Sequence, residues 1–323
     1  MLIVKEDCFE YEFRDVPENI PEGTVLGKSL FLSMDPTHIL WTKLIPQYMP
    51  AVGLGTVMRC IQVCEVVKTT DPEKFPIGSA FNSVGGVAEY TLYPVSRCSP
   101  VVPNVPLSWN IGPYSVIQGL TAWVGYKICD PKAGETMVIS GASGSVGSLA
   151  GQLAKTTGAR VIGIAGGSEK CKEVVEVFGF HGCIDYKSES VAIGLKRLCP
   201  SGVDSFFDNV GEDTLEAVLD QVNCFSRVAF CGAISTYYKI GQRASGIKNF
   251  EMILMRRVTV QGFICSDHLP ALPEAMKDIG KLHTDGKLVQ KEDIREAKIE
   301  DYVSVVNNLF TGGNKGKLIM KII

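Results

Sequence analysis

Apolar and polar positions follow two different patterns along this chain. From Thr136 onward, short apolar runs are separated by stretches whose apolar residues recur at helical spacing. Strands that alternate with helices of this length predict a parallel sheet with helices on both faces, a doubly wound α/β arrangement. The expected strands are 136–140, 160–165, 182–186, 203–210, 227–233 and 258–264, with expected helices at 168–179 and 212–222.

The first hundred residues have short apolar runs punctuated by Pro and Gly, at 24–34, 52–67 and 85–95. This pattern predicts a β-rich region. We expect the last forty residues to return to that region, because the parallel sheet already has its strands. The sequence therefore predicts two domains, a β-rich domain of residues 1–112 and 284–323 and an α/β domain of residues 113–283.

The most informative segment of the α/β domain is 138–147, an apolar run that breaks into three glycines, Gly141, Gly144 and Gly147. An amphipathic stretch and a second apolar run follow directly. The order of strand, tight turn, helix and strand predicts a Rossmann unit, in which a dinucleotide pyrophosphate binds at the helix N-terminus. Glycine lets the backbone turn sharply and approach the phosphates closely.

The end of the second strand of this unit predicts which dinucleotide binds. NAD sites usually place Asp or Glu there to hold the ribose 2′-hydroxyl. This chain has Gly166 and Gly167, followed by Ser168 and Lys170, while Glu169 is expected to point to solvent. A hydroxyl and an ammonium beside a vacant strand end favour a 2′-phosphate, and hence NADP. The alternative is that Lys170 is an ordinary surface lysine.

Composition narrows the possible partners and the compartment. The 323 residues carry a net charge of −3, with 46% hydrophobic residues, which argues against nucleic acid or an anionic membrane as the main partner. The 11 cysteines are scattered and contain no C-x-x-C pair, a pattern typical of reduced structural thiols in a cytoplasmic protein. The acidic N-terminus lacks the core of a signal peptide, and no apolar stretch approaches the ~18 residues of a membrane span.

The reaction class follows from the residues of the β-rich domain. His38 is the single histidine of residues 1–112, and no Gly-His-Glu segment occurs, so we expect no metal and no Lewis-acid alcohol oxidation. Hydride transfer without a metal needs hydrogen bonds to the oxygen that gains charge. Reduction of a carbon–carbon double bond conjugated to a carbonyl fits this requirement.

Several segments together carry a family resemblance: 31–36, 138–155, 165–170, 182–189, 206–218, 227–238 and 258–264. They resemble the zinc-independent medium-chain dehydrogenases/reductases, and within these the prostaglandin reductases (leukotriene hydroxy-dehydrogenases) and plant alkenal double-bond reductases. The similarity runs from about Leu30 to the C-terminus. It implies a GroES-like catalytic domain beside the Rossmann domain, NADP as cofactor and a homodimer.

The resemblance also implies individual roles. Tyr237 is expected to hydrogen-bond at the nicotinamide or the substrate oxygen, or else only to pack against the cofactor. Tyr186 is expected to meet the 2′-phosphate with Lys170, or else to be merely half-buried. The expected cofactor contacts are Gly144, Ser145, Val146, Gly147, Ser168, Lys170, Tyr186, Asn209, Cys231, Gly232, Ala233, Ile234, Ser235, Thr236, Tyr237, Phe263, Ile264, Cys265 and Asn314.

The chain departs from the family near the expected substrate pocket. Thr37 and His38 stand where relatives carry an aromatic residue and Met, and residues 115–118 replace a Gly-Met-Pro-like turn. His38 is either a replacement proton donor or, as we favour, a packed side chain. The favoured function is NADPH-dependent reduction of α,β-unsaturated ketones or aldehydes. The alternatives are a quinone reductase and a catalytically silent NADPH-binding or sensor protein, and the physiological substrate stays open.

Overall fold

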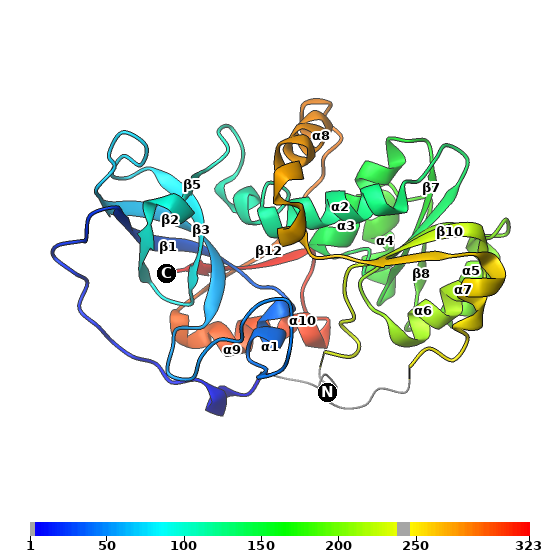
Figure 1. Ribbon diagram of the computed structural model, residues 1–323, viewed down its shortest axis with the longest axis horizontal. Helices are drawn as coiled ribbons and strands as arrows, with labels where there is room; N and C mark the ends of the chain where they lie inside the picture. Colours follow the sequence, from blue (N-terminus) through cyan, green and yellow to red (C-terminus); the bar gives the residue numbers. More distant parts are fainter. Residues whose placement is uncertain (1–3, 238–245) are drawn as a thin grey trace. The chain divides into compact units, whose positions relative to one another are not determined.

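The computed structural model describes residues 4–237 and 246–323, which form two compact units (Figure 1). Unit 1 comprises Met1–Gly112 and Glu292–Ile323, and unit 2 comprises Pro113–Lys291. The second boundary lies between 291 and 292 rather than between 283 and 284 as expected. Residues 285–291 pack on unit 2 because Val289 exchanges two hydrogen bonds with the Gln152 side chain, at 2.7 and 3.0 Å, and Lys291 pairs with Glu173.

Unit 1 is built on one largely antiparallel sheet. β1 is its central strand and pairs antiparallel with β2, β4 and β13. Strand order is β12-β13-β1-β2-β3-β5, so the two C-terminal strands extend the sheet beyond β1. The strands are β1 (Thr24–Ser33), β2 (Arg59–Thr69), β3 (Ala80–Gly86), β4 (Tyr90–Pro94), β5 (Ser99–Pro100), β12 (Glu292–Ala297) and β13 (Lys317–Ile322).

Short helices connect the strands of unit 1. The α-helices are α1 (Thr37–Trp41), α9 (Tyr302–Val306) and α10 (Asn308–Thr311), and 3₁₀ turns lie at Glu6–Cys8, Val95–Arg97, Leu107–Ile111 and Ile299–Asp301. The sequence did not predict α1, because five residues are too few to display a helical period. Four of them, from His38 to Trp41, are buried.

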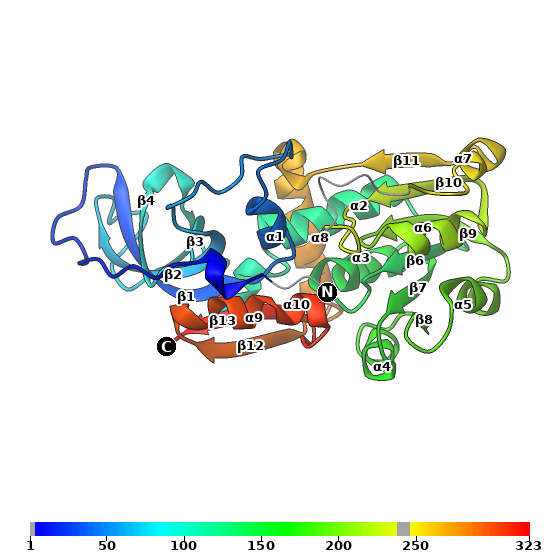
Figure 2. The ribbon, with the colours of Figure 1, turned by 90° about the horizontal axis from the view of Figure 1, so that it is seen from below.

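Unit 2 is a doubly wound parallel sheet of the Rossmann type (Figure 2). Its strand order, β11-β10-β9-β6-β7-β8, is the 3-2-1-4-5-6 order of that fold read from the other edge. β7 and β8 follow β6 toward one edge of the sheet, whereas β9 lies on the other side of β6, so the order of strand addition reverses between β6 and β9. The strands are β6 (Thr136–Ser140), β7 (Arg160–Ala165), β8 (Gly182–Asp185), β9 (Val203–Asp208), β10 (Val222–Phe230) and β11 (Thr259–Gly262).

Helices cover both faces of this sheet. They are α2 (Thr121–Cys129), α3 (Ser145–Lys155), α4 (Ser168–Glu176), α5 (Val191–Leu198), α6 (Glu212–Leu219), α7 (Glu251–Arg256) and α8 (Leu272–Thr284). A π-helical turn, Val116–Leu120, precedes α2, and a 3₁₀ segment, Cys265–Ala271, precedes α8.

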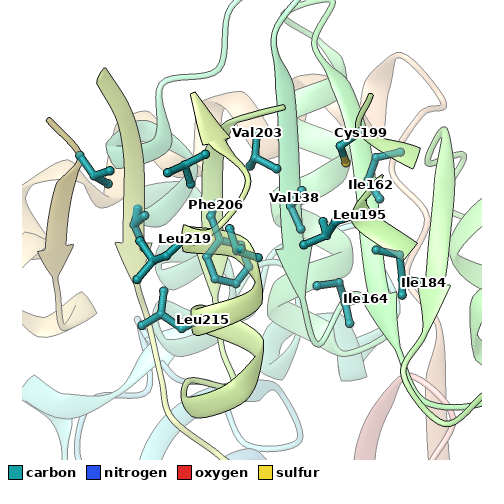
Figure 3. Packing of buried hydrophobic residues seen from close by; sticks show 14 residues of the cluster. Val138, Ile162, Ile164, Ile184, Leu195, Cys199, Val203, Phe206, Leu215 and Leu219 are labelled. Atoms are coloured by element: carbon teal, nitrogen blue, oxygen red, sulfur yellow. The ribbon is translucent and has the colours of Figure 1, made fainter. Parts of the chain in front are cut away.

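The alternation of side chains along the strands explains the two covered faces. A Cβ on Gly163 of β7 would lie 2.7 Å from Val174 of α4, so that face packs against α4. The neighbouring residues Ile162 and Ile164 point the other way, into a buried cluster that also contains Leu195 of α5 (Figure 3). Unit 2 therefore has apolar cores on both sides of its sheet, as its near-continuous apolar strands predict.

One strand begins earlier than the sequence predicts. β10 starts at Val222, inside the region where the helical pattern of 212–222 ends, and not at Arg227. Its register with β9 shifts between Val222 and Arg227, and Phe225 has a φ of 65° there. Because part of this irregular stretch is exposed, its apolar and polar residues do not alternate, and the sequence gives no strand signal before Arg227.

Candidate functional site

The glycine-rich turn lies at the end of β6, where α3 begins. Gly141 has a φ of 62°, and the Gly144 N–H donates to the Gly141 carbonyl at 3.0 Å. A Cβ on Gly147 would lie 2.5 Å from that same carbonyl oxygen, so only glycine lets the helix sit this close to the turn. The third glycine therefore fixes the packing of α3 on the turn.

The first turn of α3 offers donors to an anion. Backbone N–H groups of a first helical turn have no intrahelical acceptor. No side chain caps this helix, and its first turn carries no acidic residue. The Ser145 hydroxyl oxygen is buried and has no hydrogen-bond partner within the described residues. A pyrophosphate therefore fits the N-terminus of α3, with Ser145 and the amides of 145–147 as its donors.

Two strand ends meet at the reversal point of the sheet and are held by one carboxylate. Asp208 Oδ1 accepts hydrogen bonds from the Ser140 hydroxyl at 2.8 Å and from the amides of Val210 and Gly211 at 2.9 and 3.1 Å. Asn209 donates to Ser140 through its backbone and its side chain, each at 2.7 Å. Asn209 is thereby fixed at the crevice where Rossmann folds bind their ligands.

Asp208 and Ser140 were not singled out by the sequence analysis. Burial raises the pKa of Asp208, although the hydrogen bonds it accepts from Gly211, Val210 and Ser140 lower it. The sequence signal that could have identified them is that each is the polar residue at the end of an apolar strand, Ser140 in β6 and Asp208 in β9. A pattern of that kind does not reveal that the two strands are neighbours.

The segment after β10 is tied to the loop after β9. The amides of Cys231 and Gly232 both donate to the Asp208 carbonyl, at 2.8 and 3.1 Å, and the Ile234 amide donates to Asn209 at 3.2 Å. Ser235 donates its hydroxyl to the Val210 carbonyl at 2.6 Å. The structure thus brings the predicted contacts at 209 and 231–235 together.

Tyr237 folds back onto this segment. A Cβ on Gly232 would lie 2.8 Å from the Tyr237 hydroxyl oxygen, so the hydroxyl occupies space that only glycine leaves open. Thr236 closes the turn before it, because its amide and hydroxyl both donate to the Ala233 carbonyl. The Tyr237 hydroxyl therefore lies beside the Asn209 loop. The next residue, Tyr238, lies outside the described residues.

The residues predicted to bind the 2′-phosphate lie at the C-terminal ends of β7 and β8. Gly166 leaves room for Tyr186, whose hydroxyl oxygen would be 2.5 Å from a Cβ there. Ser168 and Lys170 lie in the first turn of α4. Asp185, which closes β8, accepts from the Gly167 amide at 2.7 Å and so joins the two strand ends. A small residue at 166 is thus required by the tyrosine.

The segment 263–265 follows β11 and returns to the sheet. Phe263 is buried and packs edge-on against Phe207 of β9, with ring centroids 6.2 Å apart. Burial raises the pKa of the Cys231 thiol, and the neighbouring Cys265 raises it further. Cys231 and Cys265 are therefore close enough to interact electrostatically. The Ile264 carbonyl accepts a hydrogen bond from the Asp267 amide at 3.1 Å.

Three expected residues belong to unit 1. Asn314 donates its side-chain amide to the Gly316 carbonyl at 2.9 Å, and its contact with a cofactor stays a prediction. His38 is fully buried, and its Nδ1 lies 3.0 Å from the Tyr302 hydroxyl. Burial lowers the His38 pKa to about 4, against the opposing effect of Asp35. His38 is thus a neutral core residue, and the Thr37 hydroxyl beside it is also buried.

Two general features complete the description of the site. Among residues 4–237 and 246–323, no group of three or more His, Cys, Asp or Glu side chains is arranged to hold a metal ion. In the same part of the chain, no helix has the length and apolar character needed to cross a membrane.

Comparisons with known proteins identify the family. A family described as zinc-binding dehydrogenase matches residues 145–281, and one described as N-terminal domain of oxidoreductase matches residues 3–101. A zinc-type alcohol dehydrogenase-like protein of Schizosaccharomyces pombe is 36% identical over 97% of this chain and 90% of its own length. The NADP⁺-dependent 2-alkenal reductase of Nicotiana tabacum is 32% identical, over 98% of this chain and 93% of its own.

A solved structure agrees with these matches. CurA from Vibrio vulnificus in complex with NADPH superposes with a TM-score of 0.87 at 30% identity, covering 95% of this chain and 93% of that one. The chain belongs to the medium-chain dehydrogenase/reductase family. Within it, the chain belongs to the zinc-independent branch of alkenal and prostaglandin reductases, which confirms the resemblance seen in the sequence. The homodimer and the cytoplasmic location stay predictions.

Proposed function

We propose that this protein is an NADPH-dependent reductase of carbon–carbon double bonds conjugated to an aldehyde or ketone. The observation that carries the proposal is the first turn of α4. There Ser168 and Lys170 follow β7, a strand that ends in glycines rather than in an acidic residue, and Tyr186 lies over Gly166. The tobacco relative is named for an NADP⁺-dependent reaction on 2-alkenals, and the Vibrio structure holds NADPH.

The chain supplies two separate seats for the cofactor. The amides at the start of α3 and the Ser145 hydroxyl bind the pyrophosphate, while Lys170 and Tyr186 bind the 2′-phosphate. Asn209 and the segment 231–237 border the nicotinamide half, where their mutual hydrogen bonds hold them in place. When bound, NADPH supplies the hydride that reaches the β-carbon of the substrate.

Tyr237 is the residue we assign to the substrate oxygen. As the β-carbon gains a hydride, negative charge accumulates on the conjugated carbonyl oxygen, which becomes an enolate. A hydroxyl already positioned to donate a hydrogen bond stabilises that charge without reorganising at the moment of reaction. Protonation of the α-carbon by water then completes the addition of one hydride and one proton across the double bond.

Tyr237→Phe tests this assignment. We expect kcat for an alkenal to fall about 10²-fold with little change in KM, because the lost hydrogen bond forms chiefly in the transition state. The measurement is NADPH oxidation with an alkenal, a cyclic enone and a quinone. Tyr126→Phe, in α2, is the control and should keep full activity.

The outcomes of this screen separate the candidate functions. Turnover of the quinone without the alkenal would identify a quinone reductase. Tight NADPH binding with none of the three substrates consumed would identify a silent binding protein. An unchanged kcat in Tyr237→Phe would leave the tyrosine with a packing role alone.

Lys170→Ala tests the cofactor preference. We expect the Kd for NADPH to rise roughly 10- to 30-fold, as a charge-assisted hydrogen bond to the phosphate is lost. The Kd for NADH should hardly change, because NADH lacks that phosphate. Cofactor fluorescence titration measures both constants. Lys172→Ala removes an exposed lysine of the same helix, paired with Glu176, and should alter neither. Equal losses for NADPH and NADH would contradict the assignment.

A further inference from the structure

Two cysteines lie against each other beneath α4. Cys171 belongs to the first half of α4, and Cys183 belongs to β8. Their sulfur atoms are 2.7 Å apart. A disulfide bond is about 2.0 Å long, so the two sulfurs need to approach by only about 0.7 Å to be joined. Both side chains are partly exposed, and both cysteines are free thiols.

The contact makes the two thiols chemically unequal. The Cys183 thiol donates a hydrogen bond to Cys171, which lowers the pKa of Cys171 and raises that of Cys183. Burial and the nearby carboxylates of Asp185 and Glu189 act against the lowering at Cys171. A helix N-terminus also favours a thiolate, and Cys171 lies one turn inside α4. Cys171 is therefore the better nucleophile of the pair.

The surroundings already hold the two segments together. The Asp185 carboxylate at the end of β8 accepts from the Gly167 amide at the start of α4, at 2.7 Å. The Cys171 amide donates to the Gly167 carbonyl at 3.1 Å, within the first helical turn. A covalent bond between Cys171 and Cys183 would thus join two segments that a hydrogen bond already holds side by side.

We propose that Cys171 and Cys183 form a thiol–disulfide pair that is oxidised reversibly by low-molecular-weight disulfides of the glutathione type. The Cys171 thiolate attacks one sulfur of the small disulfide, forms a mixed disulfide and releases one small thiolate. Cys183, no longer hydrogen-bonded to a thiolate, loses its proton to solvent and attacks the Cys171 sulfur. The second small thiolate leaves, so two protein thiols are oxidised and one small disulfide is reduced to two thiols.

The sequence around the pair allows a direct test on the full-length protein. Lys170 and Lys172 flank Cys171, so trypsin releases residues 171–172 separately from residues 173–187, which contain Cys183. The protein is incubated with oxidised glutathione, its remaining thiols are alkylated, and the digest is analysed by mass spectrometry. We expect a peptide in which 171–172 is linked to 173–187, two hydrogen masses lighter than the sum, and its loss on adding dithiothreitol.

Single variants distinguish the order of attack. Cys183→Ser should accumulate a glutathione adduct on Cys171, because the resolving thiol is absent, while Cys171→Ser should leave Cys183 unmodified. Cys224→Ser removes an exposed cysteine elsewhere and should form the linked peptide as the wild type does. Absence of the linked peptide from folded wild-type protein would overturn the proposal. It would also be overturned if glutathione added to Cys183 in Cys171→Ser as fast as it adds to Cys171 in Cys183→Ser. Both readouts are independent of NADPH binding and of turnover.

Discussion

Gly147→Ala is expected to lower kcat/KM for NADPH about 10²-fold, because it displaces the N-terminus of α3 from the turn that precedes it. The added Cβ would lie 2.5 Å from the Gly141 carbonyl oxygen and 3.0 Å from its carbonyl carbon. Both are backbone atoms, so no rotamer change relieves the clash, and the helix must shift. The same overpacking should lower the free energy of unfolding by about 1–3 kcal/mol. Cofactor titration and urea denaturation measure the two effects.

Gly280→Ala is the matched control for this substitution. Gly280 lies within α8, and a Cβ there would meet no atom within 4 Å. Replacing a mid-helix glycine by alanine should leave the NADPH kinetics unchanged and add about 0.5–1 kcal/mol to stability. If Gly147→Ala kept wild-type affinity, the close approach of α3 to the turn would not be what seats the pyrophosphate.

The strands of unit 2 could be predicted because burial on both faces makes them continuous apolar runs. Residues such as Val138 and Ile162 belong to strands flanked by helices on either side, so the sequence shows them without any knowledge of neighbours. The expected and observed bounds of β6 and β7 coincide. The doubly wound arrangement and the glycine turn follow from local order alone, and both are confirmed.

Features that depend on distant residues could not be predicted in the same way. The Ser140–Asp208 hydrogen bond joins residues 68 apart in sequence, and its existence depends on which strands are neighbours. The fold of Tyr237 onto Gly232 likewise depends on a reversal after β10. The boundary at 291 depends on the hydrogen bonds between Val289 and Gln152, 137 residues apart. None of these contacts leaves a periodic signal.

Unit 1 contains a buried ion pair, between Lys317 and Asp35, that likewise joins residues far apart in the sequence. Lys317 opens β13, the apolar closing strand, and its ammonium contacts Asp35 Oδ1 at 2.7 Å, Ser33 Oγ at 2.6 Å and the Met34 carbonyl at 3.0 Å. The lysine side chain is 2% exposed and the aspartate side chain 10%. A lysine in an apolar strand signals a buried partner, but the sequence does not say which carboxylate it meets. The pair ties the C-terminal strand to the corner between β1 and α1.

Lys317→Met is expected to lower the free energy of unfolding by about 3–5 kcal/mol at neutral pH, because it leaves Asp35 ionised in an apolar interior without its cation. Burial by itself raises the Asp35 pKa, and the charge of Lys317 with the hydrogen bonds from Lys317 and Ser33 brings it below 3.8. His38 adds to this lowering only in acid, where the imidazole becomes protonated. In the wild type, the stability that this carboxylate contributes is therefore present above pH 3.8 and is lost as the pH falls through its folded pKa. Urea denaturation across pH 3–8 measures the difference.

The pH dependence distinguishes a lost ion pair from lost packing. In Lys317→Met, burial dominates and the Asp35 pKa rises, so the variant loses stability as pH rises and its carboxyl ionises. The deficit in stability relative to wild type should therefore be largest near neutral pH and shrink in acid.

Asp35→Asn combined with Lys317→Met removes both charges and should recover much of the loss. Lys321→Met, on the same strand but in an exposed pair with Glu296, should change stability little at any pH. A deficit in Lys317→Met that is constant with pH would mean that methionine merely packs worse than lysine, and that the charge of Asp35 is not what Lys317 stabilises.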